Sequence, residues 1–130
     1  MAQMRVAVTG AGGKTGRAVV RALADAGMDV TAWVRRDAQC HQAKADGATC
    51  ARVVDLCDAA TVEDALAGQD GIYFIAPNMH PGEVDMTAAT VRAAERSDVP
   101  HFMLHSVLAP YAPAMPHHVR KAECENLLRE

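Results

Sequence analysis

Short apolar runs rich in β-branched residues alternate with longer, alanine-rich segments along the chain. The short runs have the length and composition of strands, and the longer segments have the apolar spacing of amphipathic helices. Such alternation is typical of βαβ units, in which helices connect parallel strands and cover both faces of the sheet. We predict strands at residues 5–9, 30–34, 49–54, 71–76 and 101–106, and helices at residues 14–26, 38–45, 59–66, 84–97 and 117–129.

The stretch 71–76 is apolar almost throughout, which indicates a strand in the interior of a sheet that helices cover on both faces. The pattern therefore predicts an α/β fold, a doubly wound, Rossmann-like parallel sheet with strand order 3-2-1-4-5. The chain has 130 residues, 50% of them apolar, which is enough for one domain with a substantial core. We assign residues 1–130 to a single domain.

Composition and charge exclude several classes of partner. The formal net charge is -3 and no basic run is longer than two residues, so the chain lacks the extended positive surface that nucleic acids require. No stretch approaches the roughly 18 consecutive apolar residues of a membrane span, and no signal peptide is evident. We expect a cytoplasmic protein with a small-molecule substrate, and an exposed edge at the fifth strand that allows pairing with a second copy.

The cysteines and histidines do not predict a metal site. The four cysteines show no C-x-x-C spacing, so we interpret them as reduced, packed thiols. His101 and His105 share one face of a predicted strand, but four residues along a strand span about 13 Å, too far for one metal ion. We therefore expect no bound metal.

The segment TGAGGKTGR, residues 9–17, follows the first predicted strand and contains elements of two phosphate-binding loops. A nucleoside triphosphate loop has the spacing G-x-x-x-x-G-K-[ST], and Gly13-Lys14-Thr15 supplies its ending. The first glycine of that motif would fall at position 8, which is Val8. The triphosphate interpretation therefore fails on spacing.

The alternative spacing is G-x-x-G-x-x-G, formed by Gly10, Gly13 and Gly16 between a strand and a helix. The first glycine allows a tight turn, the second lets backbone amides approach a pyrophosphate, and the third lets the helix pack closely on the strand. The helix N-terminus then faces the anion. This context predicts a dinucleotide-binding loop, with a plain strand-to-helix turn as the alternative. The predicted cofactor-binding residues of the loop are Gly10, Gly12, Gly13, Lys14, Thr15 and Gly16.

The residues after the second predicted strand indicate which dinucleotide is bound. An acidic residue about 20 positions beyond the loop would bind the adenosine ribose of NAD(H), but this chain has Arg35 and Arg36 there. Arginine suits a 2'-phosphate through charge-assisted, bidentate hydrogen bonds. NADP(H) is therefore favoured over NAD(H). The alternative is that both arginines are solvated loop charges that Asp37 partly neutralises.

Taken together, these residues resemble the NmrA-like group of atypical short-chain dehydrogenases/reductases over essentially the whole chain. The resemblance implies a pyrophosphate at the glycine loop, a 2'-phosphate at Arg35, adenine beside Asp55 and Leu56, and a ribose lined by Ala76 and Pro77. Members of this group are typically longer, so a C-terminal substrate-binding part is expected to be missing. The segments that carry the resemblance are TGAGGKTGRAVVRAL, WVRR, Val54-Asp55-Leu56, YFIAP, His105-Ser106 and HHVRKAECENLLRE.

The resemblance also implies candidate catalytic residues. Reductases of the wider superfamily use Tyr-x-x-x-Lys on a helix, a spacing that places both side chains on one helical face, with a serine at the end of the preceding strand. Lys121 and Ser106 match this pattern, and His117 stands at the tyrosine position. The implied roles are proton donation by His117, binding of the nicotinamide ribose by Lys121 and positioning of the substrate oxygen by Ser106.

The leading interpretation is an NADPH-dependent oxidoreductase of the NmrA-like type that reduces a small organic substrate. Because His117 replaces the tyrosine, the alternative is a non-catalytic, NADP(H)-sensing regulator. A third interpretation is an inactive cofactor-binding fragment of a longer enzyme. The sequence does not identify the substrate.

Overall fold

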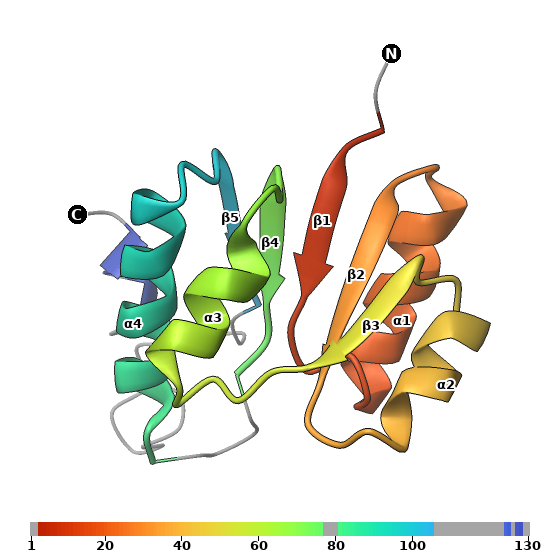
Figure 1. Ribbon diagram of the computed structural model, residues 1–130, viewed down its shortest axis with the longest axis horizontal. Helices are drawn as coiled ribbons and strands as arrows, with labels where there is room; N and C mark the ends of the chain where they lie inside the picture. Colours follow the sequence, from red (N-terminus) through yellow and green to blue (C-terminus); the bar gives the residue numbers. More distant parts are fainter. Residues whose placement is uncertain (1–2, 77–80, 106–123, 126, 129–130) are drawn as a thin grey trace.

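The computed structural model describes residues 3–76, 81–105, 124–125 and 127–128. Within these residues, parallel strands alternate with helices as far as Leu104, which confirms the predicted alternation (Figure 1). Most of the last predicted helix lies outside the described residues. The elements are β1 (Arg5–Val8), α1 (Lys14–Asp25), β2 (Asp29–Val34), α2 (Gln39–Ala45), β3 (Cys50–Val53), α3 (Ala59–Leu66), β4 (Gly71–Phe74), α4 (Glu83–Arg96) and β5 (His101–Leu104).

The sheet has the strand order β3-β2-β1-β4-β5, as predicted, and every pair of neighbouring strands is parallel. Because the strands are parallel, all their carboxyl ends lie at one edge of the sheet, the lower edge in Figure 1. The loops that lead from β1, β2 and β3 into the following helices gather at this edge. In open α/β sheets, ligands bind at the carboxyl edge, near the point where the strand order reverses.

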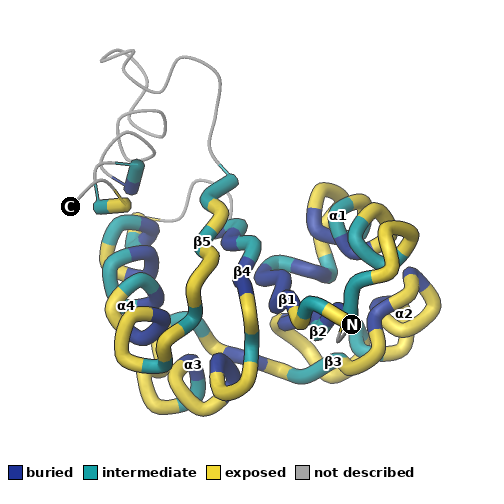
Figure 2. Tube along the Cα trace, turned by 90° about the horizontal axis from the view of Figure 1, so that it is seen from above, coloured by how far each residue is buried: buried dark blue, intermediate teal, exposed yellow. Residues whose placement is uncertain are grey.

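The sheet has an apolar core on each face. Helices α1 and α2 cover one face, and α3 and α4 cover the other (Figures 1 and 2). Neighbouring β2 residues serve opposite cores, since Val34 belongs to the first and Trp33 to the second, which explains the continuous apolar end of this strand. The first core contains Val8, Ala11, Val20, Val30, Ala32, Val34, Ala43 and Ala48. The second contains Ala7, Trp33, Val54, Val62, Ala65, Leu66, Ile72, Phe74, Ala76, Met86, Ala93 and Ala94.

Two helix boundaries lie where the sequence predicts them. Gly27, just beyond α1, has a φ of +85°, which a glycine adopts without strain. Asp58 precedes α3 and accepts hydrogen bonds from the Thr61 backbone N–H at 3.3 Å and from the Thr61 hydroxyl at 2.8 Å. The side-chain bond from Thr61 is the main cause that lowers the pKa of Asp58. Asp58 is therefore the N-cap of this helix.

The strand β4 ends at Phe74, so the predicted extension to residue 76 is wrong. The cause is Thr9, a buried residue directly after β1. Its Oγ1 accepts a hydrogen bond from the Ile75 N–H at 2.6 Å and donates one to the Ile75 carbonyl at 2.8 Å. A side chain thus replaces the backbone ladder between the two strands, and it ties the beginning of the glycine loop to the segment after β4.

A buried carboxylate joins α1 to the end of α2. The Asp46 side chain is 5% exposed and lies 3.0 Å from Arg17 Nε and 3.2 Å from an Arg21 guanidinium nitrogen. Gln42 donates a further hydrogen bond to it at 3.3 Å. The hydrogen bond from Arg17 is the largest cause that lowers the pKa of Asp46, while burial acts in the opposite direction. This cluster fixes α2 against the helix that follows the glycine loop.

The described residues also test what the sequence predicts for cysteines, metal ligands and membrane-spanning helices. All four cysteines are free, but Cys50 and Cys57 are exposed, so the predicted packing is wrong for these two. No group of three or more histidine, cysteine or acidic side chains in the described ranges is arranged to hold a metal ion. Among the helices of this part of the chain, none combines the length and the apolar character that a membrane crossing needs.

Candidate cofactor site

The glycine-rich loop, residues 9–13, lies at the carboxyl end of β1, in the middle of the sheet (Figure 1). The Thr9 N–H donates a hydrogen bond to the Tyr73 carbonyl of β4 at 3.1 Å, and the Ala11 N–H donates one to the Trp33 carbonyl of β2 at 3.2 Å. The loop is therefore held from both neighbouring strands. This position is the one expected for a pyrophosphate-binding loop.

Packing within the protein accounts for two of the three motif glycines. Gly10 has a φ of +60°, and a Cβ atom on it would lie 3.2 Å from the Ile75 carbonyl oxygen. A Cβ on Gly16 would overlap the Gly10 carbonyl and would lie 2.7 Å from the Ala11 Cα. The first glycine is thus needed for the turn and the third for the close approach of α1 to the loop, as the motif predicts.

Packing does not account for Gly13, the N-cap of α1. A Cβ atom on it would lie 3.5 Å from the Gly10 carbonyl oxygen, an ordinary van der Waals distance. Its backbone is extended, with φ of -84° and ψ of 171°, so other residues could adopt it. Gly13 and the next two residues, Lys14 and Thr15, are exposed at the beginning of the helix. A bare glycine at this point leaves the N–H groups of the helix N-terminus open to an anion.

Two adjoining hollows lie beside the loop at the ends of β2 and β3, and Arg35, Val54 and Leu56 line both of them. Arg35 and Leu56 were predicted cofactor residues, and the fold brings them together. Asp55 lines the larger hollow, of about 270 Å³, while the exposed Arg36 lines neither of the two. The smaller hollow, of about 50 Å³, is also lined by Thr9, Gly10, Trp33, Val34 and Ile75, and the larger by Val53, Cys57 and Met86.

Gln39 is a residue of this site that the sequence analysis missed. It is the first residue of α2, and its Oε1 accepts hydrogen bonds from the backbone N–H groups of Arg35 and Arg36, each at 3.1 Å. A glutamine that reaches back to an N–H three residues earlier is half of the capping-box pattern. This spacing is the signal that could have found it, although Arg36 stands where the pattern has serine or threonine.

Of the other predicted site residues, the structure describes only some. Ala76 is buried two residues beyond the end of β4, at the carboxyl edge of the sheet. Pro77, Ser106, His117 and Lys121 lie outside the described residues. The catalytic assignment therefore stays a prediction.

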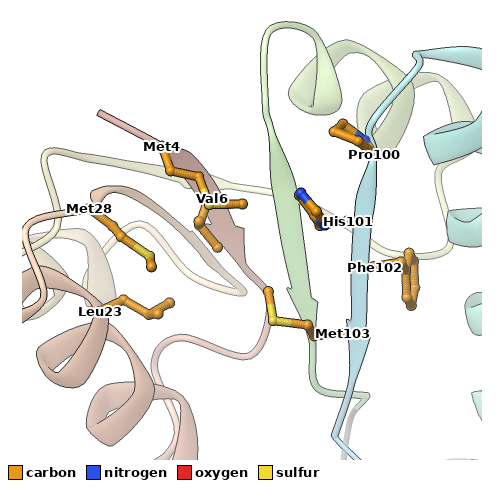
Figure 3. A pocket seen from close by; sticks show the side chains of 8 residues that line it. All are labelled: Met4, Val6, Leu23, Met28, Pro100, His101, Phe102 and Met103. Atoms are coloured by element: carbon orange, nitrogen blue, oxygen red, sulfur yellow. The ribbon is translucent and has the colours of Figure 1, made fainter. Parts of the chain in front are cut away.

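A third hollow, of about 390 Å³, lies apart from the glycine loop (Figure 3). It opens beside the first residues of β1 and β5, at the amino edge of the sheet, and Met103 on its wall is 37% exposed. The glycine loop and the arginines lie at the opposite edge, so this hollow is not part of the cofactor site. Its lining residues are Met4, Val6, Leu23, Met28, Pro100, His101, Phe102 and Met103.

The strand order, the glycine loop at the end of β1 and the arginine turn at the end of β2 define a Rossmann-type dinucleotide-binding domain. The chain belongs to the NAD(P)H-binding family, which it matches over residues 10–130. Within that family it is of the NmrA-like, atypical short-chain dehydrogenase/reductase type, in agreement with the motifs of the sequence.

Known proteins similar to this chain are longer. An NAD(P)H azoreductase of Xenophilus azovorans is 34% identical over 110 residues, which cover 83% of this chain and 38% of the relative. A solved structure from Bacillus halodurans has a TM-score of 0.87 at 25% identity and covers 98% of this chain and 65% of that one. The NADPH complex of an NADPH-dependent quinone oxidoreductase from Escherichia coli has a TM-score of 0.81 at 22% identity, covering 95% and 44%. The chain thus spans less than two thirds of each of these proteins.

Proposed function

We propose that this chain binds NADP(H) in preference to NAD(H) and supplies the cofactor domain of an NADPH-dependent oxidoreductase of the NmrA-like type. The observation that carries the proposal is the position of Arg35, which lines both hollows beside the glycine loop. The adenosine end of a dinucleotide lies between that loop and the end of β2. A guanidinium at this point matches the 2'-phosphate, the group that distinguishes NADP(H) from NAD(H).

Each part of the site has a task in this function. The N–H groups at the beginning of α1, uncovered at Gly13, bind the pyrophosphate. Arg35 and Arg36 bind the 2'-phosphate, and the apolar wall formed by Val54 and Leu56 packs against adenine. The bound cofactor supplies the hydride, and the protein supplies binding and orientation.

The chemistry at the substrate rests on His117, Lys121 and Ser106. In the proposed function His117 donates a proton, Lys121 holds the nicotinamide ribose and Ser106 positions the substrate oxygen. Azo compounds and quinones are the first substrates to test, because the similar proteins include an azoreductase of Xenophilus azovorans and a quinone oxidoreductase of Escherichia coli. We expect His117→Ala to abolish turnover while NADPH binding is retained.

An NADP(H)-sensing regulator is the second candidate, because His117 occupies the position of the superfamily tyrosine. Turnover separates the two functions. If the protein binds NADPH but oxidises it with no member of a panel of azo compounds, quinones, aldehydes, imines and enones, the sensor is favoured. Oxidation of NADPH that depends on one of these substrates identifies a reductase.

A second copy of this chain is the proposed protein partner. The strand β5 is at an edge of the sheet within the described residues and pairs only with β4 there. An edge strand presents unpaired backbone groups that a second strand can bind. Sedimentation equilibrium over a range of concentrations tests this proposal, which predicts a mass that rises toward the dimer.

The first test of the cofactor proposal is a fluorescence titration with NADPH and NADH in parallel, on the wild type and on Arg35→Ala. We expect the wild type to bind NADPH more tightly than NADH. We expect Arg35→Ala to lower the affinity for NADPH by about tenfold or more and to change the affinity for NADH by less than about twofold. Arg96→Ala is the matched control, because Arg96 is an exposed residue at the end of α4 that pairs with Glu63. Equal affinities for the two cofactors in the wild type would contradict the preference.

A further inference from the structure

The carboxamide of Gln39 lies where the glycine loop meets the arginine turn. Its Oε1 accepts hydrogen bonds from the Arg35 and Arg36 N–H groups, each at 3.1 Å. A Cβ atom built on Gly12 would lie 2.5 Å from the Gln39 Cδ and 2.9 Å from its Oε1. Gln39 is half-buried, and its carboxamide fills the space between the two segments predicted to bind the pyrophosphate and the adenosine end of the cofactor.

Two converging backbone N–H groups can bind a phosphate oxygen as well as an amide oxygen. In a dinucleotide-binding domain the adenosine ribose lies between the glycine loop and the end of β2, so its 2'-substituent arrives beside Gln39. A 2'-hydroxyl is small and neutral and leaves the amide on the two N–H groups. A 2'-phosphate is larger and charged, and its oxygens can accept hydrogen bonds from the same two N–H groups.

We propose that Gln39 determines how the site discriminates between a 2'-phosphate and a 2'-hydroxyl, because its neutral amide yields the Arg35 and Arg36 N–H groups to the phosphate and retains them otherwise. This inference rests on the proposed binding of NADP(H). The exchange leaves no backbone donor unsatisfied, since the two N–H groups pass from one oxygen acceptor to another. The residue must carry no negative charge, because a carboxylate at this position would repel the phosphate.

The test is Gln39→Glu, with NADPH and NADH affinities measured by fluorescence titration at low and high salt. Glutamate has the same length and an oxygen that accepts the same two hydrogen bonds, so the arginine turn keeps its support. We expect NADPH affinity to fall by about tenfold or more, and NADH affinity to change by less than about twofold, because like charges repel at close range. Higher salt should reduce the difference in NADPH affinity between the wild type and Gln39→Glu, because salt screens the repulsion.

A second substitution makes the opposite prediction. Gln39→Lys replaces the amide with a cation, and we expect NADPH affinity to rise relative to NADH by about threefold or more. Gln3→Glu is the control for net charge, because Gln3 is exposed and its amide donates to the Gly27 carbonyl, outside the cofactor site. That variant should bind both cofactors as the wild type does.

The outcomes separate this inference from the function on which it rests. If the wild type prefers NADPH and both Gln39 variants keep the wild-type ratio of affinities, Gln39 only supports the turn and the inference is wrong. If both variants lose affinity for NADPH and NADH equally, Gln39 again only supports the turn and the inference is wrong. If the wild type binds neither cofactor, the proposed function fails first and the inference falls with it.

Discussion

The carbonyl of Gly10 occupies the place where Gly16 would carry a Cβ atom. The glycine loop and the first turn of α1 are thus in direct backbone contact, and the positive φ of Gly10 makes the turn that brings them together. Both glycines serve the fold itself. Gly13, between them, has room for a side chain, so packing does not explain its identity.

The first prediction concerns Gly16→Ala. The added methyl group would overlap backbone atoms of Gly10 and Ala11, which cannot move aside as the end of a side chain can. We expect the free energy of unfolding to fall by about 2–3 kcal/mol, the usual cost of overpacking. Urea unfolding followed by circular dichroism measures it. An unchanged midpoint would show that α1 can withdraw from the loop.

Gly13→Ala is the matched substitution on the same loop. Its methyl group meets only an ordinary contact with Gly10, so we expect a loss of stability below about 1 kcal/mol. The methyl group does stand in front of the helix N-terminus, and NADPH affinity should fall by about tenfold or more. Titration and urea unfolding of the same preparation separate the two effects. Full affinity in this variant would exclude the loop as the pyrophosphate site.

A third prediction concerns the carboxylate between α1 and α2. Asp46→Asn keeps the shape of the side chain but removes the charge that Arg17 and Arg21 contact. We expect the free energy of unfolding to fall by about 1 kcal/mol, because both arginines are partly exposed and water screens the pair. Thermal unfolding at neutral pH measures the change. Asp70→Asn is the comparison, because the Asp70 carboxylate accepts an exposed hydrogen bond from the Arg5 backbone N–H.

The same carboxylate predicts a dependence of stability on pH. The pKa of Asp46 is lowered in the folded protein, chiefly by the hydrogen bond from Arg17. Its contribution is therefore complete above the unfolded-state pKa of about 3.9 and is lost as the pH falls through the lower, folded-state value. The pKa of Asp58 is lowered too and adds to the same decline. Unfolding curves from pH 7 to about pH 2 should show wild type and Asp46→Asn converging at the acid end.

A fifth prediction uses Trp33, the one tryptophan of the sequence. Its side chain is 2% exposed and it lines the small hollow beside Arg35. Because the cofactor is proposed to bind at this hollow, NADPH should quench tryptophan emission and gain emission of its own by energy transfer. Trp33→Phe should remove the transfer while direct excitation still detects bound NADPH. Binding without any transfer would place the cofactor elsewhere.

Spacing in the sequence was sufficient to predict the strand order and the glycine loop, because both follow from local periodicity and from a motif of fixed length. It was not sufficient for Thr9, whose hydroxyl ends the ladder between β1 and β4 through a contact with a residue distant in the sequence. The role of Gln39 likewise depends on how closely α2 approaches Gly12. Ser106, His117 and Lys121, which the resemblance assigns to catalysis, lie outside the described part of the chain.

The bonds that hold the glycine loop also bear on the entropy of cofactor binding. Ala11 is bonded to β2, Thr9 to the segment after β4, and Gly16 packs against the loop from α1. A loop fixed in this way before the ligand arrives has little conformational freedom left to lose. In the proposed binding mode, the ordering cost therefore falls on exposed side chains such as Arg35 and Lys14 and on the cofactor itself.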